Sequence, residues 1–194
     1  MAKDKYSSFD ELQKHEAPDK DYQLYICDAG SRVTIIAPHG GKIEPRTSDL
    51  AKRIARENYN CYCFEGLKEK NNACLHITSH HFDEPNATRI LSKSEVVVAI
   101  HACTGTAGRV HIGGLDKELA NLIARELEDR GVSVSNDHPR FQGSNPDNIC
   151  NRGATGMGVQ LEVTRDLRDD LEKVKVIAQA VRAALLTLTR TSRN

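Results

Sequence analysis

The sequence has no tryptophan, and only 5% of its residues are aromatic. Single-stranded nucleic acids are bound largely by stacking on aromatic side chains, so this composition argues against such a binding surface. An excess of charge of one sign is also lacking, because 27 basic residues balance 27 acidic ones. No global field therefore attracts the chain to nucleic acid or to a membrane, and any anion must be recognised by a local cluster of Lys and Arg.

Long apolar runs are missing as well. No segment approaches the roughly 20 apolar residues of a membrane-spanning helix, and the polar N-terminus lacks the apolar core of a signal peptide. We therefore expect a protein that is cytoplasmic as synthesised, so that action outside the cell would require lysis or an unusual export route. The six cysteines include no Cys-x-x-Cys pair, which gives zinc-ribbon and thioredoxin-like sites little support. Buried, reduced thiols are the expectation for them.

The length of 194 residues suits one domain of ordinary size. We expect a single catalytic domain over 1–194, with a polar N-terminal leader over 1–20. A domain of this size buries roughly 70% of the surface of its unfolded chain and needs no structural metal to fold. A metal bound to such a chain would therefore point to catalysis.

Apolar runs and capping residues predict strands that alternate with helices. The expected strands are 33–37, 59–64, 75–78, 95–100, 132–134 and 158–163, and the expected helices are 47–57, 85–92, 116–130 and a long final helix from about 169. Such alternation is typical of an α/β sheet that is covered on both faces. Several connections are too short for a helical crossover, so some antiparallel pairing is also expected.

Polar side chains at the ends of three predicted strands form the candidate site. His39 directly follows the first strand, His101 ends the strand 95–100, and Glu162 lies near the end of the last one. In open α/β sheets ligands bind beyond the carboxyl ends of the strands, so these side chains converge if the strands are parallel neighbours. A carboxylate inside an apolar strand is either functional or ion-paired, and Arg165 is one possible partner for Glu162.

The segment His39–Glu44 reads HGGKIE. Its two glycines permit a sharp turn, so an imidazole and a carboxylate five positions apart can face one ion. Two histidines and one glutamate form a known catalytic zinc shell. Taken alone, the spacing also suits solvated loop residues, and a histidine at a strand end is often structural.

A second group of histidines comprises His76, His80 and His81, followed by acidic residues. Adjacent residues on a strand point to opposite faces, so His80 and His81 cannot both bind one ion without a break in the strand. We expect one or two of this group to line the cleft or orient a substrate, with His81 as a candidate.

Several stretches of the chain together resemble a known family. Residues 36–44 resemble the metal motif of the poly-γ-glutamate hydrolases of bacilli and their phages. Further stretches resemble the same family in the expected order, namely 62–68, 75–79, 82–85, 148–153 and 158–165. The resemblance spans nearly the whole chain and implies a zinc-carboxypeptidase-like fold, with a mixed, mostly parallel sheet and helices on both faces.

The same resemblance implies residue roles. His39, Glu44 and His101 would hold one zinc ion, and Glu162 would match the catalytic glutamate of the carboxypeptidases. The implied activity is hydrolysis of γ-glutamyl bonds in the polymer of a capsule or slime layer. Ala102 stands where a glycine is expected, but it is not a proposed ligand. No arginine matches the one with which carboxypeptidases bind a terminal carboxylate, so carboxypeptidase activity itself is not implied.

Poly-γ-glutamate carries a free α-carboxylate on every residue, so its cleft needs fixed cations. Arg109, Arg140, Arg152 and Arg165 lie in loop-like or Gly-rich segments near the candidate site. Arginine forks bind carboxylates through two parallel hydrogen bonds. Arg152 and Arg165 are the first choices for this role, and Arg109 and His81 come next.

Two other functions are compatible with these residues. A zinc amidohydrolase or deacylase that acts on a small N-acyl amino acid would share the metal shell but have a closed pocket. A non-enzymatic module would hold an anion in its Gly-rich loops and use its histidines structurally. Zinc content separates this module from the two enzymes. The oligomeric state, the preference for D- or L-glutamate and the product length stay open.

Overall fold

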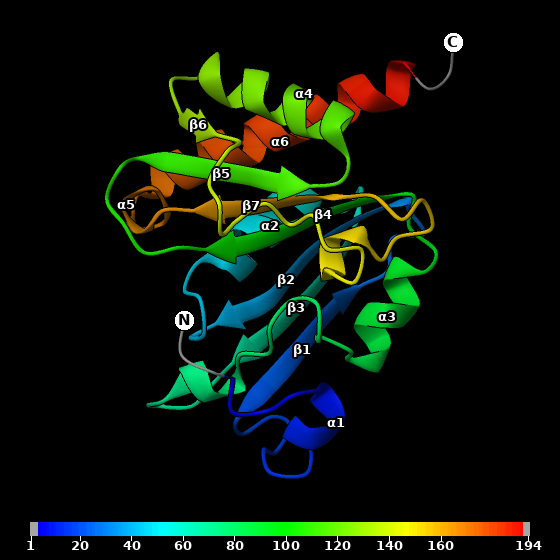
Figure 1. Ribbon diagram of the computed structural model, residues 1–194, viewed down its shortest axis with the longest axis vertical. Coiled ribbons are helices and arrows are strands. Elements are labelled where there is room, and N and C mark those ends of the chain that lie inside the picture. The colour runs from blue at the N-terminus through cyan, green and yellow to red at the C-terminus, as the bar shows by residue number, and fades with distance from the viewer. Residues whose placement is uncertain (1–3, 192–194) are drawn as a thin grey trace.

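A seven-stranded sheet runs through the centre of the protein (Figure 1). The computed structural model describes residues 4–191. In spatial order the strands are β1 (Tyr22–Cys27), β3 (Asn60–Gly66), β2 (Val33–Gly41), β4 (Val96–Ala102), β7 (Val159–Val163), β5 (Arg109–Gly114) and β6 (Ser133–Ser135). Four of the six pairings are parallel, whereas β1 pairs with β3 and β5 with β7 in antiparallel fashion. The predicted mixed, mostly parallel sheet is confirmed.

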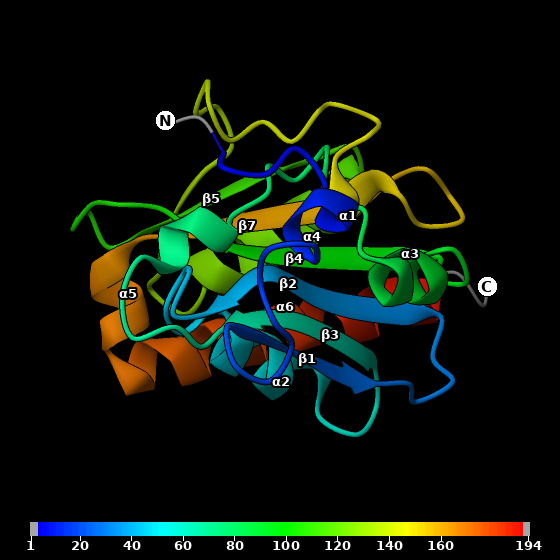
Figure 2. The same cartoon turned by 90° about the horizontal axis from the view of Figure 1, so that it is seen from below.

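Helices cover both faces of the sheet (Figures 1 and 2). One face packs against α2 (Thr47–Ala55), α4 (Lys117–Glu128) and α6 (Leu171–Thr191), which share the larger apolar core with it. The other face packs against α1 (Phe9–Leu12) and α3 (Pro85–Leu91), with the 3₁₀ turns η1 (Asn72–Leu75) and η2 (Ile149–Asn151) nearby. A short helix, α5 (Arg165–Asp169), joins β7 to α6.

Strand periodicity decides which side chains face the functional side. Along β7, Val159, Leu161 and Val163 belong to the larger core. Because successive side chains alternate between faces, Gln160 and Glu162 point to the opposite face. There the covering helices are short, which leaves the ends of β4 and β7 accessible from loops.

Local sequence signals account for the predicted helices. The Asp116 side chain accepts a hydrogen bond from Leu119 N and begins α4, and Glu84 does the same for Ala87 N at the start of α3. Apolar residues at helical spacing, such as Leu119 of α4, then bury one stripe against the sheet. These helices lie within a few residues of their predicted bounds.

The strand predicted over 75–78 is wrong. Leu75 ends the 3₁₀ turn η1, and the next residues are extended but pair with no strand. Leu75 and Ile77 are buried. The alternation of apolar residues in this segment therefore arises from their burial in the core and not from pairing in the sheet. The main chain is bound instead by the N-terminal segment, because Thr78 N donates to the Asp4 carboxylate.

The segment expected to be a polar leader is folded over residues 4–20. Tyr6, Phe9 and Leu12 are buried in the smaller core, and the Glu16 carboxylate accepts from the Tyr6 hydroxyl and pairs with Lys68. All six cysteines are free, and four of them are buried. Among the described helices, none is long and apolar enough to cross a membrane.

Candidate metal centre and catalytic pocket

A tight turn at the end of β2 brings His39 and Glu44 together. Glu44 N donates to His39 O at 2.8 Å and closes the turn. The turn requires glycine at positions 40 and 41. Gly41 has a φ of 63°, and a Cβ on Gly40 would lie 2.0 Å from Ser48 Oγ. The Gly-Gly pair therefore places a carboxylate beside an imidazole, as the sequence predicted.

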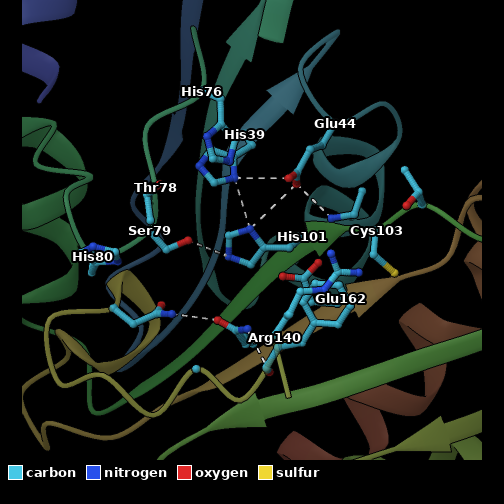
Figure 3. A pocket seen from close by; sticks show the side chains of 16 residues that line it. His39, Glu44, His76, Thr78, Ser79, His80, His101, Cys103, Arg140 and Glu162 are labelled. Carbon is cyan, nitrogen blue, oxygen red and sulfur yellow. Dashed lines mark hydrogen bonds and ion pairs between the residues drawn. The ribbon is translucent and has the colours of Figure 1, made fainter. Parts of the chain in front are cut away.

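His101, on the neighbouring strand β4, completes a three-residue group (Figure 3). His39 Nδ1 lies 3.4 Å from Glu44 Oε1, His101 Nδ1 lies 3.8 Å from Glu44 Oε2, and the two Nδ1 atoms are 3.2 Å apart. All three donor atoms fall within 4.8 Å of one another. The structure thus brings together the three predicted ligands.

Hydrogen bonding favours a cation between these donors. His39 Nε2 lies 2.8 Å from the carbonyl oxygen of Ile77 and must donate to it, so a neutral His39 has its lone pair on Nδ1. That lone pair faces His101 Nδ1 and a carboxylate, an arrangement that needs a proton or a metal ion to be stable. Two imidazoles and one carboxylate suit zinc, and the carbonyl partner of His39 is the usual outer support of such a ligand.

The pKa shifts of Glu44 and His101 favour the forms that bind a metal, whereas His39 must lose a proton that Glu44 stabilises. Burial opposes charge on His39, but the adjacent Glu44 carboxylate raises its pKa. Burial likewise works against ionised Glu44, yet His39 and His101 hold the pKa of Glu44 below its usual value. Burial lowers the pKa of His101 to about 3. Glu44 is therefore ionised and His101 neutral, which are the forms that bind metals.

Glu162 lies beside His101, because the parallel register of β4 and β7 pairs these two residues. Burial, followed by the charge of Glu44, raises the pKa of Glu162 to about 8. Arg165 does not neutralise Glu162, since it is exposed and pairs with Asp169 on α5. A carboxyl group with a pKa near neutrality in a cleft is typical of a general acid or base.

Arg168 is a buried cation that the sequence analysis did not single out. Its guanidinium donates to the carbonyl oxygens of Val163, Pro45 and Cys103. It ties the end of β7 to the metal-side turn and contributes a positive charge that acts on Glu162. In sequence it resembles an ordinary helix residue, because its three acceptors are main-chain atoms and two of them, in Pro45 and Cys103, come from distant segments.

These groups open into one cavity of about 420 Å³. Its lining comprises the four predicted metal and catalytic residues together with His76, Thr78, Ser79, His80, Ala102, Cys103, Thr104, Arg140, Phe141, Gly143, Asn148 and Gln160. One wall comes from the segment after η1, and the opposite wall comes from the loop before η2 (Figure 3).

Among the candidate substrate-binding residues, Arg140 lines this cavity, and the other four lie outside its lining. They are His81, Arg109, Arg152 and Arg165. The Arg152 guanidinium is occupied by the carbonyl oxygens of His80, Phe82 and Asp147, and it holds the His80 wall in place. The other three are exposed.

An Asp–His pair stands next to the metal group. The Asp4 carboxylate accepts from His76 Nδ1 at 2.7 Å and from Thr78 N and Oγ1 at 2.6 Å. The His76 ring packs on the His39 ring with centroids 4.0 Å apart. Nothing in the sequence pointed to Asp4, because its partners lie more than 70 residues away along the chain.

The model of a family described as poly-gamma-glutamate hydrolase matches residues 6–186. The chain belongs to this family. Among curated relatives, the SPbeta prophage-derived protein YoqZ of Bacillus subtilis (strain 168) is 40% identical over 173 residues. That match covers 88% of this chain but 62% of YoqZ, so the chain spans less than two thirds of this relative.

Solved structures agree with membership of the family. A bacteriophage poly-gamma-glutamate hydrolase is 30% identical, with a TM-score of 0.94 over 97% of this chain and 100% of the other. A zinc-free apo form of YNDL is 32% identical, with a TM-score of 0.88 over 94% of this chain and 98% of the other. The predicted resemblance is confirmed.

Proposed function

We propose that this protein is a zinc-dependent hydrolase that cleaves γ-glutamyl amide bonds in poly-γ-glutamate. The observation that carries the proposal is the convergence of His39, Glu44 and His101 within 4.8 Å in a chain of the poly-gamma-glutamate hydrolase family. The description of its relative YNDL as zinc-free supports zinc as the metal.

His39, Glu44 and His101 would hold one zinc ion through two imidazole nitrogens and a carboxylate. When bound, zinc would polarise the scissile carbonyl and acidify the attacking water. It would also offset the charge of Glu44, which after burial is the second cause of the raised pKa of Glu162. The protein's own contribution is the fixed orientation of the donors. The Ile77 carbonyl orients His39, and Ala102 N donates to Glu44 Oε2 at 2.9 Å.

Glu162 is proposed as the general base. It stands beside His101 on the adjacent strand and lines the same cavity, so it reaches a water placed there. It would take a proton from the attacking water and return that proton to the leaving amine, which makes the departing group a neutral amine. No Lys or Arg forms an ion pair with Glu162 in the described part of the chain, so the carboxyl group is available for proton transfer.

The proposed substrate is the polymer itself, and neither nucleic acid nor a membrane takes part. A deacylase for a small N-acyl amino acid would use the same three ligands, so substrate size is what separates the two enzymes. A non-enzymatic anion-binding module would need neither zinc nor Glu162.

The test uses high-molecular-weight poly-γ-glutamate and zinc-loaded wild type and Glu162→Gln, followed by gel mobility and solution viscosity. We expect wild type to remove the high-mass polymer. Glu162→Gln should slow cleavage by on the order of 10²- to 10⁴-fold, because it keeps the shape but loses the base. An intact polymer with one zinc bound per chain would favour the small-molecule deacylase, and absence of zinc binding would refute both enzymes.

A further inference from the structure

Arg140 is the one Lys or Arg among the described residues that line the cavity. The other side chains of the lining that bear a carboxyl group are Glu44 and Glu162, and the ionised Glu44 repels an anionic substrate. Within the described side chains, no carboxylate lies in ion-pair range of the Arg140 guanidinium, which is exposed at the cavity wall. A cation without an ion-pair partner is therefore available to a ligand.

The aromatic ring of Phe141 lies next to the Arg140 guanidinium. Its Cζ lies 5.7 Å from the centroid of the Phe141 ring. That ring stacks on His138 with centroids 4.2 Å apart and lies 5.3 Å from the His111 ring of β5. Cation–π contact with a ring that is itself packed on two others restricts where the guanidinium can point.

The main chain of this loop is also fixed to the sheet. Gln160 Nε2 donates to Phe141 O at 3.1 Å, and Gly114 N donates to Gln142 O at 2.8 Å. The approach is close enough that a Cβ on Gly113 would lie 2.2 Å from Phe141 O. Arg140 is thus presented from an anchored loop into the cavity that the metal group also lines, and selective recognition of a substrate group requires such anchoring.

We propose that Arg140 binds the α-carboxylate of a γ-glutamyl residue and makes that carboxylate a requirement for efficient cleavage. This inference rests on the proposed function and names the chemical group of the substrate that the site recognises. Arginine suits the role because its fork donates two parallel hydrogen bonds to a carboxylate. The polymer backbone without that group is a chain of γ-aminobutyryl residues, which has the same amide spacing but no charge.

The experiment compares γ-glutamyl and γ-aminobutyryl oligomers of equal length as substrates, each with zinc-loaded protein. Wild type should cleave the γ-glutamyl oligomer with the higher kcat/KM. Arg140→Gln should lower kcat/KM for that oligomer by on the order of 10- to 100-fold and leave the γ-aminobutyryl oligomer unchanged. Arg140→Lys should retain part of the preference, because it keeps the charge but not the fork.

Arg89→Gln is the matched control, since it neutralises an exposed arginine on α3 that does not line the cavity. Melting temperature and zinc content of each variant show that the fold and the metal group are intact. Equal loss on both oligomers, or no loss on either, would overturn the role of Arg140. If wild type binds zinc but cleaves neither the polymer nor the γ-glutamyl oligomer, the proposed function fails first.

Discussion

Removal of zinc should lower the melting temperature of the protein by several degrees. A ligand that binds the folded state alone stabilises it by RT ln(1 + [L]/Kd), which is about 2.7 kcal/mol when free zinc is about 100-fold above Kd. A domain of this size shifts by about 2–4 °C per kcal/mol, so the expected difference is about 5–11 °C. The unfolded chain cannot match this binding, because His39 and His101 come from different strands. Scanning calorimetry in zinc-buffered and chelator-treated samples measures the difference.

Two variants distinguish a ligand from a neighbouring group. His101→Gln removes one of three donors and should abolish the zinc-dependent shift. Glu162→Gln lines the same cavity but supplies no donor to the group, so it should keep the shift while losing activity. A melting temperature of wild type that does not respond to zinc, or an undiminished response in His101→Gln, would refute the assigned metal group.

Three further outcomes follow from the structure. In the metal-free protein the pKa of Glu162 is about 8 against an ordinary 4.5, so its protonated form stabilises the fold below about pH 4.5 and that contribution is lost as pH rises through 8. Between pH 5 and pH 8, denaturant titration of the metal-free proteins should therefore show the unfolding free energy of Glu162→Gln rising relative to that of wild type, by on the order of a few kcal/mol. Arg152→Ala leaves three main-chain carbonyls without their donor and should cost about 1–3 kcal/mol of unfolding free energy with KM unchanged, whereas a raised KM at unchanged stability would return Arg152 to a binding role. Gly113→Ala places a Cβ against the Phe141 carbonyl, and steady-state kinetics should show a lower kcat/KM for γ-glutamyl oligomers with zinc binding retained.

The parts of the fold that could be predicted are those that bury a continuous apolar run. The strand Val96–Ala102 and the helix Lys117–Glu128 belong to this class. The edge strand Tyr22–Cys27 is mostly exposed, and Arg109–Gly114 carries two glycines, so neither shows a run of that kind. Their strand structure depends on pairing with neighbouring strands, and the local pattern of apolar residues in the sequence does not reveal such pairing.

The same distinction separates the two halves of the site. The metal group could be predicted because strand ends and a Gly-Gly turn fix short side chains to within a few ångströms. For substrate binding the sequence named four candidate arginines but did not put Arg140 first, because the acceptors that a long guanidinium side chain meets are known only from the folded chain. Arg152 reaches main-chain carbonyls, Arg165 turns to a neighbouring aspartate, and Arg140 is held by a ring.

The contact between Asp4 and the wall of the cavity affects how the chain can be shortened for study. Trimming a polar stretch from the N-terminus is a routine way to improve expression or crystallisation. Here a cut after residue 8 would remove the carboxylate that holds His76 and Thr78, so the His76 ring that packs on His39 would lose this anchor. Shortened versions of this protein should therefore keep Asp4.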